Sequence, residues 1–197
     1  MAVRLLKQSK SFGGVLQHYA HESTATNSSM RFSVYLPPTA NLNHKVPAIY
    51  FLAGATRNEE TFLSFGGAQR FAAARGVALV APDTSPRISQ GSSHWAYGPG
   101  ASWYVDATQP RWTKHYNMQS YVSKELPALI QIHFPILPTK QSIMGHSMGG
   151  HGALITALRN PDLFESVSAF APACNPTHGE YGAKAFKNYL GADHATW

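Results

Sequence analysis

Two short stretches of the chain are apolar at nearly every position and end at turn-forming residues. Val46–Leu52 reads Val-Pro-Ala-Ile-Tyr-Phe-Leu and ends near Gly54, and residues 77–81 read Val-Ala-Leu-Val-Ala and end at Pro82-Asp83. Such runs are typical of strands that are buried on both faces of a parallel sheet. Residues 59–75, which lie between them, have a helical composition, and Gly76 predicts the end of that helix.

An alternating pattern precedes these runs. Residues 30–36 (Met-Arg-Phe-Ser-Val-Tyr-Leu) alternate roughly between apolar and polar positions and stop at Pro37-Pro38. This pattern predicts a half-exposed antiparallel strand. Residues 15–21 are expected to pair with it across a turn at residues 25–29, which adds an antiparallel edge to the sheet.

The second half of the chain also alternates between helix and strand. Its pattern predicts helices over residues 117–133, 149–158 and 181–190, and strands over residues 142–144 and 166–171. Pro127 is expected to shift or kink the first of these helices. The alternation predicts an α/β fold with a mostly parallel sheet, in a single domain that spans residues 1–197.

Residues 84–116 are predicted to form a long loop rich in Gly, Ser, Pro and aromatic residues. Loops of this length inside a compact domain are usually functional. The aromatic residues Trp95, Tyr97, Trp103 and Tyr104 allow two interpretations. They pack the loop onto the sheet, or Trp95 or Tyr97 lines an apolar pocket for a small substrate group.

Composition narrows the classes of function. The chain has 197 residues, of which 44% are apolar and only 13% are charged. Its net charge of +6 comes from a shortage of acids, and no run of Lys or Arg occurs, which argues against a nucleic-acid partner. A single cysteine, the lack of an apolar leader and the lack of any stretch near the ~20 residues that span a bilayer predict a cytoplasmic protein without a membrane partner.

No metal site is expected from the ten histidines. His18 and His21 lie three residues apart in a predicted strand, which places them on opposite faces. No pair of histidines at helical metal-binding spacing and no cysteine cluster accompanies them.

The motif that carries chemistry is Gly145-His146-Ser147-Met148-Gly149, which has the form G-x-S-x-G. It follows a predicted strand and opens a predicted helix, as a nucleophile elbow requires. The turn is too tight for side chains at its flanks, and it projects the Ser147 hydroxyl above the sheet. The helix N-terminus beneath it favours developing negative charge. Ser147 is therefore the predicted nucleophile.

An oxyanion hole needs two backbone N–H donors near this serine. One is expected from the residue after the nucleophile, Met148. The other is expected from the loop Ala53-Gly54-Ala55-Thr56, which makes the Ala55 amide the candidate. His146 and His151 are poor candidates for the base, because one is adjacent to Ser147 on the turn and the other lies inside the helix.

The chain resembles the S-formylglutathione hydrolase family of the α/β-hydrolase superfamily. The matching segments run in family order over nearly the whole chain, and they are residues 11–14, 32–38, 67–70, 81–87, 104–108, 125–130, 145–154, 168–172 and 174–176. The resemblance implies an α/β-hydrolase fold and a cytoplasmic serine thioesterase that converts S-formylglutathione to glutathione and formate and also cleaves small esters. It implies Ser147 as nucleophile, Ala55 and Met148 as oxyanion donors, no cofactor, no metal and a homodimer.

Two local departures from the family concern the rim of the site. Arg57 stands where the family commonly has a redox-sensitive cysteine, so thiol sensitivity at that place is expected to be absent. Residues 90–95 (Gln-Gly-Ser-Ser-His-Trp) contain no acid, whereas the family often has acids before this tryptophan. This difference is expected to alter the rim or the recognition of glutathione.

The third departure concerns the catalytic triad. The superfamily order is Ser, then acid, then His, and in the family both partners lie beyond the last predicted helix. Downstream of Ser147 the chain offers Asp162, Asp193, His178 and His194, none of them in the family's pattern. The triad acid and base are therefore expected to be absent, with residues 166–171 left as an unprotected sheet edge.

Three functions remain open at this point. The first is a thioesterase of this family that lacks the C-terminal third and is impaired, because a serine without a base is a weak nucleophile. The second is a non-catalytic remnant of that enzyme. The third is an acyltransferase, in which an alcohol replaces water as acceptor.

Overall fold

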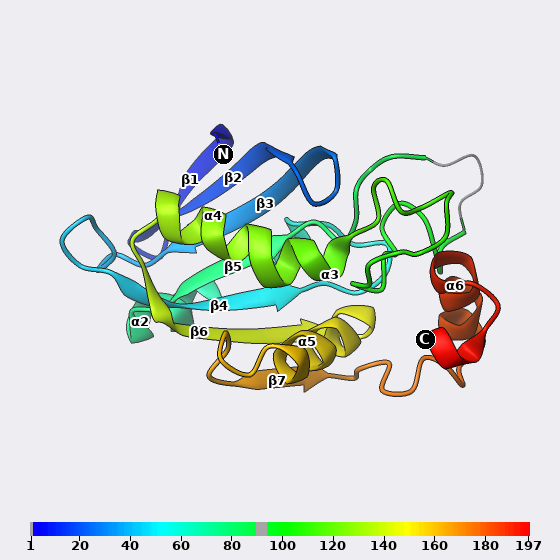
Figure 1. Cartoon of the computed structure of the whole chain (residues 1–197). Helices are drawn as coiled ribbons and strands as arrows, with labels where there is room; N and C mark the ends of the chain where they lie inside the picture. Colours follow the sequence, from blue (N-terminus) through cyan, green and yellow to red (C-terminus); the bar gives the residue numbers. More distant parts are fainter. Residues whose placement is uncertain (1, 90–93) are drawn as a thin grey trace.

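The computed structural model describes residues 2–89 and 94–197 (Figure 1). Of the acid-free stretch 90–95 that the sequence singles out, residues 90–93 lie outside the described residues. The strands are β1 (Val3–Ser11), β2 (Gly14–Ser23), β3 (Ser28–Leu36), β4 (Val46–Leu52), β5 (Ala78–Pro82), β6 (Ile136–His146) and β7 (Val167–Phe170). The helices are α1 (Thr61–Phe65), α2 (Gln69–Arg75), α3 (Met118–Ser120), α4 (Leu126–His133), α5 (Met148–Arg159) and α6 (Glu180–Leu190), with a π-helical turn η1 (Tyr121–Glu125) and a 3₁₀ turn η2 (His194–Thr196).

All these strands form one mixed sheet in the order β1-β2-β3-β5-β4-β6-β7. Strands β5, β4, β6 and β7 are parallel, and β1, β2 and β3 add an antiparallel edge. This confirms the predicted α/β fold and its antiparallel edge. The sheet of the described residues is mixed, with three parallel and three antiparallel strand pairings. Strand β1 was not predicted, because nearly all its side chains are exposed and it therefore has no apolar pattern.

Helices cover both faces of the sheet. In Figure 1, α4 and α5 lie in front of the sheet and α2 lies behind it. The main core joins β-strand residues such as Val34 and Val80 to the aromatic loop and α4, while Leu79, on the opposite face of β5, packs in a smaller cluster with Leu63 and Ala72. The apolar run of β5 is thus buried on both faces, as its composition predicts.

Two predicted helices differ in detail from the structure. The expected helix over residues 59–75 is interrupted between α1 and α2, because Gly67 adopts a left-handed φ of 60°. The helix over residues 117–133 contains the π-helical turn η1 immediately before α4, which carries Pro127 near its start. A proline cannot donate the regular helical hydrogen bond, so this irregularity agrees with the shift expected there.

The predicted long loop is held by buried aromatic residues. Tyr104, Trp112 and Tyr116 are almost fully buried, and Trp112 contacts the rings of both Tyr116 and Tyr189 edge-on. The loop therefore forms part of the core beside the C-terminal ends of the parallel strands. None of the helices in the described part of the chain is long and apolar enough to cross a bilayer.

Candidate active site

Ser147 occupies a strained turn between β6 and α5. Its backbone has φ 56° and ψ −121°, a left-handed conformation that non-glycine residues rarely adopt. Its N–H donates to the Phe170 carbonyl at 3.0 Å, and its own carbonyl accepts from the amides of His151 and Ala173, each at 3.1 Å. The end of β7 and the first turn of α5 therefore hold the strained residue in place.

The two glycines of the motif are required by close approach of main chains. A Cβ on Gly145 would overlap the carbonyl of Gly149, and a Cβ on Gly149 would overlap the carbonyl of Leu52 at the end of β4. The strand, the tight turn and the helix thus occur as the motif predicts.

The loop after β4 lies directly beside this turn. A Cβ on Gly54 would come within 3.2 Å of the Ser147 Cβ. The loop is fixed from the other side, because Tyr104 Oη donates to the Ala53 carbonyl at 2.9 Å and the Thr56 amide donates to the Gly100 carbonyl at 2.8 Å. Both oxyanion candidates are therefore brought to the same edge of the sheet as Ser147.

The amides of Ala55 and Met148 are available for a ligand. Within the described residues, neither donates to another loop or to a side chain. The Met148 side chain is buried, and its sulfur accepts from the Trp103 amide at 3.3 Å. This contact joins the aromatic loop to the first residue of α5.

Backbone strain is concentrated around this turn. Among the described residues, seven non-glycine residues have a positive φ, and two of them lie in the hairpin turns at Phe12 and Asn27. The other five belong to segments at the C-terminal edge of the sheet, and they are Thr56, Trp103, Tyr104, Ser147 and Ala171. Strained residues cluster at functional sites because surrounding structure must hold them there.

Neither nearby histidine is placed as a base for Ser147. His146 is exposed at the rim. His151 is buried in α5 and packs edge-on against Trp103, with ring centroids 6.0 Å apart. Burial, aided by the charge of Arg159, lowers the pKa of His151 to about 4, so its ring is neutral near pH 7. No described residue forms a hydrogen bond with the Ser147 hydroxyl.

The two histidines and two aspartates that the sequence offers downstream of Ser147 lie among neighbours in their own segments. His178 Nδ1 lies 3.0 Å from the side-chain oxygens of Thr177 and Asn175. The His194 ring stacks on Trp197, with centroids 3.9 Å apart. Asp193 accepts from the Ala195 amide at 3.0 Å, and Asp162 lies in the turn after α5.

Comparisons with known proteins agree with this geometry. The family model described as "Putative esterase" matches residues 23–197. The chain is 48% identical over its whole length to the S-formylglutathione hydrolase of Bos taurus, of which it covers 71%, and 50% identical over 95% of its length to that of Arabidopsis thaliana, of which it covers 67%. A solved S-formylglutathione hydrolase structure from Agrobacterium tumefaciens superposes with a TM-score of 0.94 at 43% identity, over 98% of this chain and 70% of that chain.

The chain belongs to the S-formylglutathione hydrolase family. It spans about 70% of the length of the relatives that it matches. The resemblance inferred from the sequence is thereby confirmed, together with the α/β-hydrolase fold.

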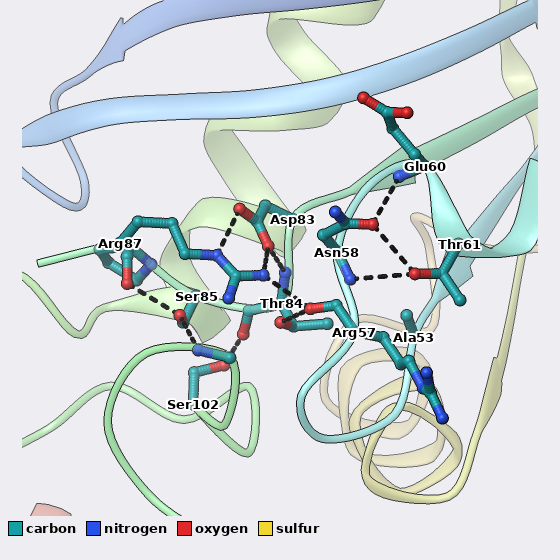
Figure 2. A network of polar contacts seen from close by, with 12 residues as sticks. Ala53, Arg57, Asn58, Glu60, Thr61, Asp83, Thr84, Ser85, Arg87 and Ser102 are labelled. Carbon is teal, nitrogen blue, oxygen red and sulfur yellow. Dashed lines mark hydrogen bonds and ion pairs between the residues drawn. The ribbon is translucent and has the colours of Figure 1, made fainter. Parts of the chain in front are cut away.

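Arg57 contributes its main chain rather than its side chain to the loop after β4 (Figure 2). Its carbonyl accepts from Thr84 Oγ1 at 2.6 Å and from Arg87 Nη2 at 2.7 Å. The guanidinium of Arg57 is exposed and points away from this network. Arg87 is itself paired with Asp83 at 2.5 and 2.8 Å, so the loop after β4 is tied to the segment after β5.

The two candidate substrate residues of the long loop lie in different surroundings. Trp95 is 49% exposed and its ring lies 4.2 Å from that of Tyr181 in α6. Tyr181 lines a shallow cavity of about 290 Å³ together with Trp103 and Cys174. Tyr97 is partly buried, and its ring contacts Trp112 edge-on. Substrate contact by either residue stays a prediction.

The sequence motif did not point to the residues that support the site. Tyr104 holds the loop of Ala55, and Trp103 holds Met148. Both are adjacent residues of the long loop with a positive φ, which no local sequence pattern predicts. The Asp83 and Arg87 pair has a visible signal, since opposite charges lie four residues apart directly after a buried strand.

Proposed function

We propose that this chain carries the nucleophile of a serine thioesterase that hydrolyses S-formylglutathione to glutathione and formate. The observation that carries the proposal is the left-handed Ser147 between β6 and α5, with the loop after β4 packed against its Cβ. Membership of the S-formylglutathione hydrolase family supports the choice of substrate, since the relatives bear that name.

The reaction follows from the placement of these groups. Ser147 Oγ attacks the thioester carbonyl, and its proton goes to a base. The amides of Ala55 and Met148 donate to the oxyanion that forms, and the N-terminus of α5 stabilises the same negative charge. Collapse of the tetrahedral intermediate releases the glutathione thiol, and water then attacks the formyl ester to release formate and restore the serine.

The base and the acid that orients it are not supplied by the described residues around Ser147. In this proposal they belong to the part of the family's length that the 197 residues do not cover. A serine elbow without these partners retains only the small rate that the oxyanion hole and substrate binding provide.

A second candidate function is a non-catalytic form of the enzyme. It is favoured by the absence, within the described residues, of any histidine hydrogen-bonded to the Ser147 hydroxyl. It is also favoured by β7, the last strand of the sheet, in which Val167 and Phe170 are 37% and 54% exposed. An open apolar edge invites pairing with another strand.

Turnover of S-formylglutathione separates the two candidates. The 197-residue chain is compared with the same chain fused to the C-terminal part of the bovine relative that it does not cover. Hydrolysis by the fused chain alone supports a thioesterase whose base lies outside these residues. Equal hydrolysis by both forms contradicts the non-catalytic candidate, and no hydrolysis by the folded fused chain contradicts the thioesterase. An alcohol added as acceptor, with analysis of products, distinguishes hydrolysis from acyl transfer.

A further inference from the structure

A polar cavity of about 570 Å³ opens at the same edge of the sheet as Ser147, on the β3 side. Strand β3 runs antiparallel to β5, with Phe32 opposite Pro82, so the residues before Phe32 lie beyond the C-terminal end of β5. The cavity is lined by the start of β3, by residues 58–60 after β4 and by residues after β5. Figure 2 shows Asn58, Glu60, Asp83 and Arg87, which belong to its walls.

Glu59 is the unusual member of this cavity. Glu59 is only 3% exposed, yet it forms no ion pair within 4 Å among the described residues. Burial, together with the nearby charge of Asp83, raises the pKa of its carboxyl group, and a hydrogen bond from its own backbone and the charge of Arg31 oppose that rise. Burying a carboxylate without an ion-pair partner costs free energy, and a cationic group that enters the cavity would offset that cost.

The two arginines of the cavity differ in their ion pairs and hydrogen bonds. Arg87 is committed to Asp83 and to the Arg57 carbonyl. Arg31 is exposed and, within the described residues, has no carboxylate within 4 Å. The cavity therefore presents a cation at Arg31 and a buried carboxyl group at Glu59, neither of which forms an ion pair within 4 Å among the described residues. This arrangement matches an amino acid with free ammonium and carboxylate groups.

We propose that this cavity binds the γ-glutamyl end of the substrate's glutathione group, with its α-ammonium on Glu59 and its α-carboxylate on Arg31. This inference rests on the proposed thioesterase function and extends it to substrate recognition. It assigns the specificity for the thiol peptide to residues separate from those that act on the acyl group.

The position of the cavity relative to Ser147 suits this role. Ser147 follows β6, Asp83 follows β5 and Arg31 lies on β3. Two to three strand spacings of ~4.8 Å therefore separate Ser147 from the strands that line the cavity, which is about 10–14 Å. A γ-glutamylcysteine unit is comparable with three extended residues, roughly 10 Å. One loop also joins both places, since Ala55 lies beside the nucleophile turn and Glu59 lies four residues further along.

Binding can be measured without any turnover. S-methylglutathione, a thioether that cannot be hydrolysed, is titrated into the 197-residue chain by calorimetry, beside the analogue that lacks the α-amino group. Glu59→Gln and Arg31→Met are the test variants. Glu22→Gln and Arg75→Met, both at exposed positions outside the cavity, are the matched controls. Circular dichroism and the thermal midpoint verify that each variant is folded.

Loss of a charge-assisted hydrogen bond is expected to weaken binding of S-methylglutathione about tenfold or more in each test variant, with the controls unchanged. Glu59→Gln is further expected to bind the two ligands equally, whereas the wild-type chain prefers the one with the amino group. Undetectable binding to the wild-type chain, or equal binding by the wild type and both test variants, would overturn the inference. Failure of the thioesterase assay with these binding results intact would count against the proposed function alone.

Discussion

The phenol of Tyr104 donates a hydrogen bond of 2.9 Å to the carbonyl of Ala53, at the start of the loop after β4. The ring of the same tyrosine lies against α5, where a Cβ on Gly152 would come within 2.5 Å of it. Tyr104 thus connects α5, the helix that follows Ser147, to the loop that carries Ala55. We therefore expect the distance between the amides of Ala55 and Met148, the proposed oxyanion donors, to depend on this residue.

Replacing Tyr104 with phenylalanine should therefore affect stability and the site together. Tyr104→Phe leaves the buried Ala53 carbonyl without its donor, and such a loss costs about 1–3 kcal/mol. Urea unfolding measures the change in the free energy of unfolding. Tyr19→Phe is the matched control, because the Tyr19 ring stacks on Phe32 and its hydroxyl has no partner among the described residues. Equal effects of the two substitutions would contradict the role given to Tyr104.

The close approach at Gly149 predicts a large penalty for any side chain there. Gly149→Ala forces a methyl group against the Leu52 carbonyl. Because the main chain of β4 cannot move aside, we expect the free energy of unfolding to fall by about 3 kcal/mol or more. Gly179→Ala is the control, since the nearest atom to its Cβ would be 3.8 Å away. Thermal unfolding of both variants tests this prediction, and a Gly149→Ala chain as stable as Gly179→Ala would refute it.

The buried ring of His151 predicts a loss of stability in mild acid. Its pKa is about 4 in the folded chain, against 6.5 when unperturbed, because burial disfavours the charged form. Between these values the unfolded chain binds more protons than the folded chain. The contribution of His151 is thus complete above pH 6.5 and is lost as the pH falls toward 4, by up to about 3 kcal/mol.

Urea unfolding at about pH 7.5 and about pH 5 measures this dependence. Burial also lowers the pKa values of His18 and His21, which act in the same direction, so the variant must be compared with the wild type. His151→Phe should show a smaller loss between the two pH values than the wild type, and His44→Phe, at an exposed loop position, should not. A His151→Phe chain with an undiminished loss would contradict the assignment.

The sequence predicted the parts of this fold that rest on local patterns. The buried strands at residues 46–52 and 77–81 and the turn at Ser147 follow from apolar runs and from glycine spacing. Strand β1 was not predicted, because its side chains are exposed and carry no apolar pattern. The contacts of Tyr104 with Ala53 and of Glu59 with its cavity join residues through the tertiary fold, and no local spacing encodes them.

Arg57 is predicted to be replaceable despite its place in the oxyanion loop. Its side chain is exposed, and its hydrogen bonds are made by its main chain: the carbonyl accepts from Thr84 and Arg87, and the amide donates to the Gly54 carbonyl. Arg57→Ala should change the free energy of unfolding by less than about 0.5 kcal/mol. Thr84→Val, which removes a buried donor to that carbonyl, should cost about 1 kcal/mol or more. Urea unfolding of both variants tests this difference, and the reverse order would contradict it.

Ser147 is the proposed nucleophile, and replacing it with alanine tests that role. The rate of S-formylglutathione hydrolysis is measured for the fused chain with Ser147→Ala, beside Ser166→Ala as a control at an exposed serine. Loss of a triad serine typically lowers kcat by about 10⁶-fold, so we expect a fall of at least ~10³-fold for Ser147→Ala and none for the control. Hydrolysis by the folded Ser147→Ala chain at a rate near that of the unsubstituted fused chain would show that Ser147 is not the nucleophile.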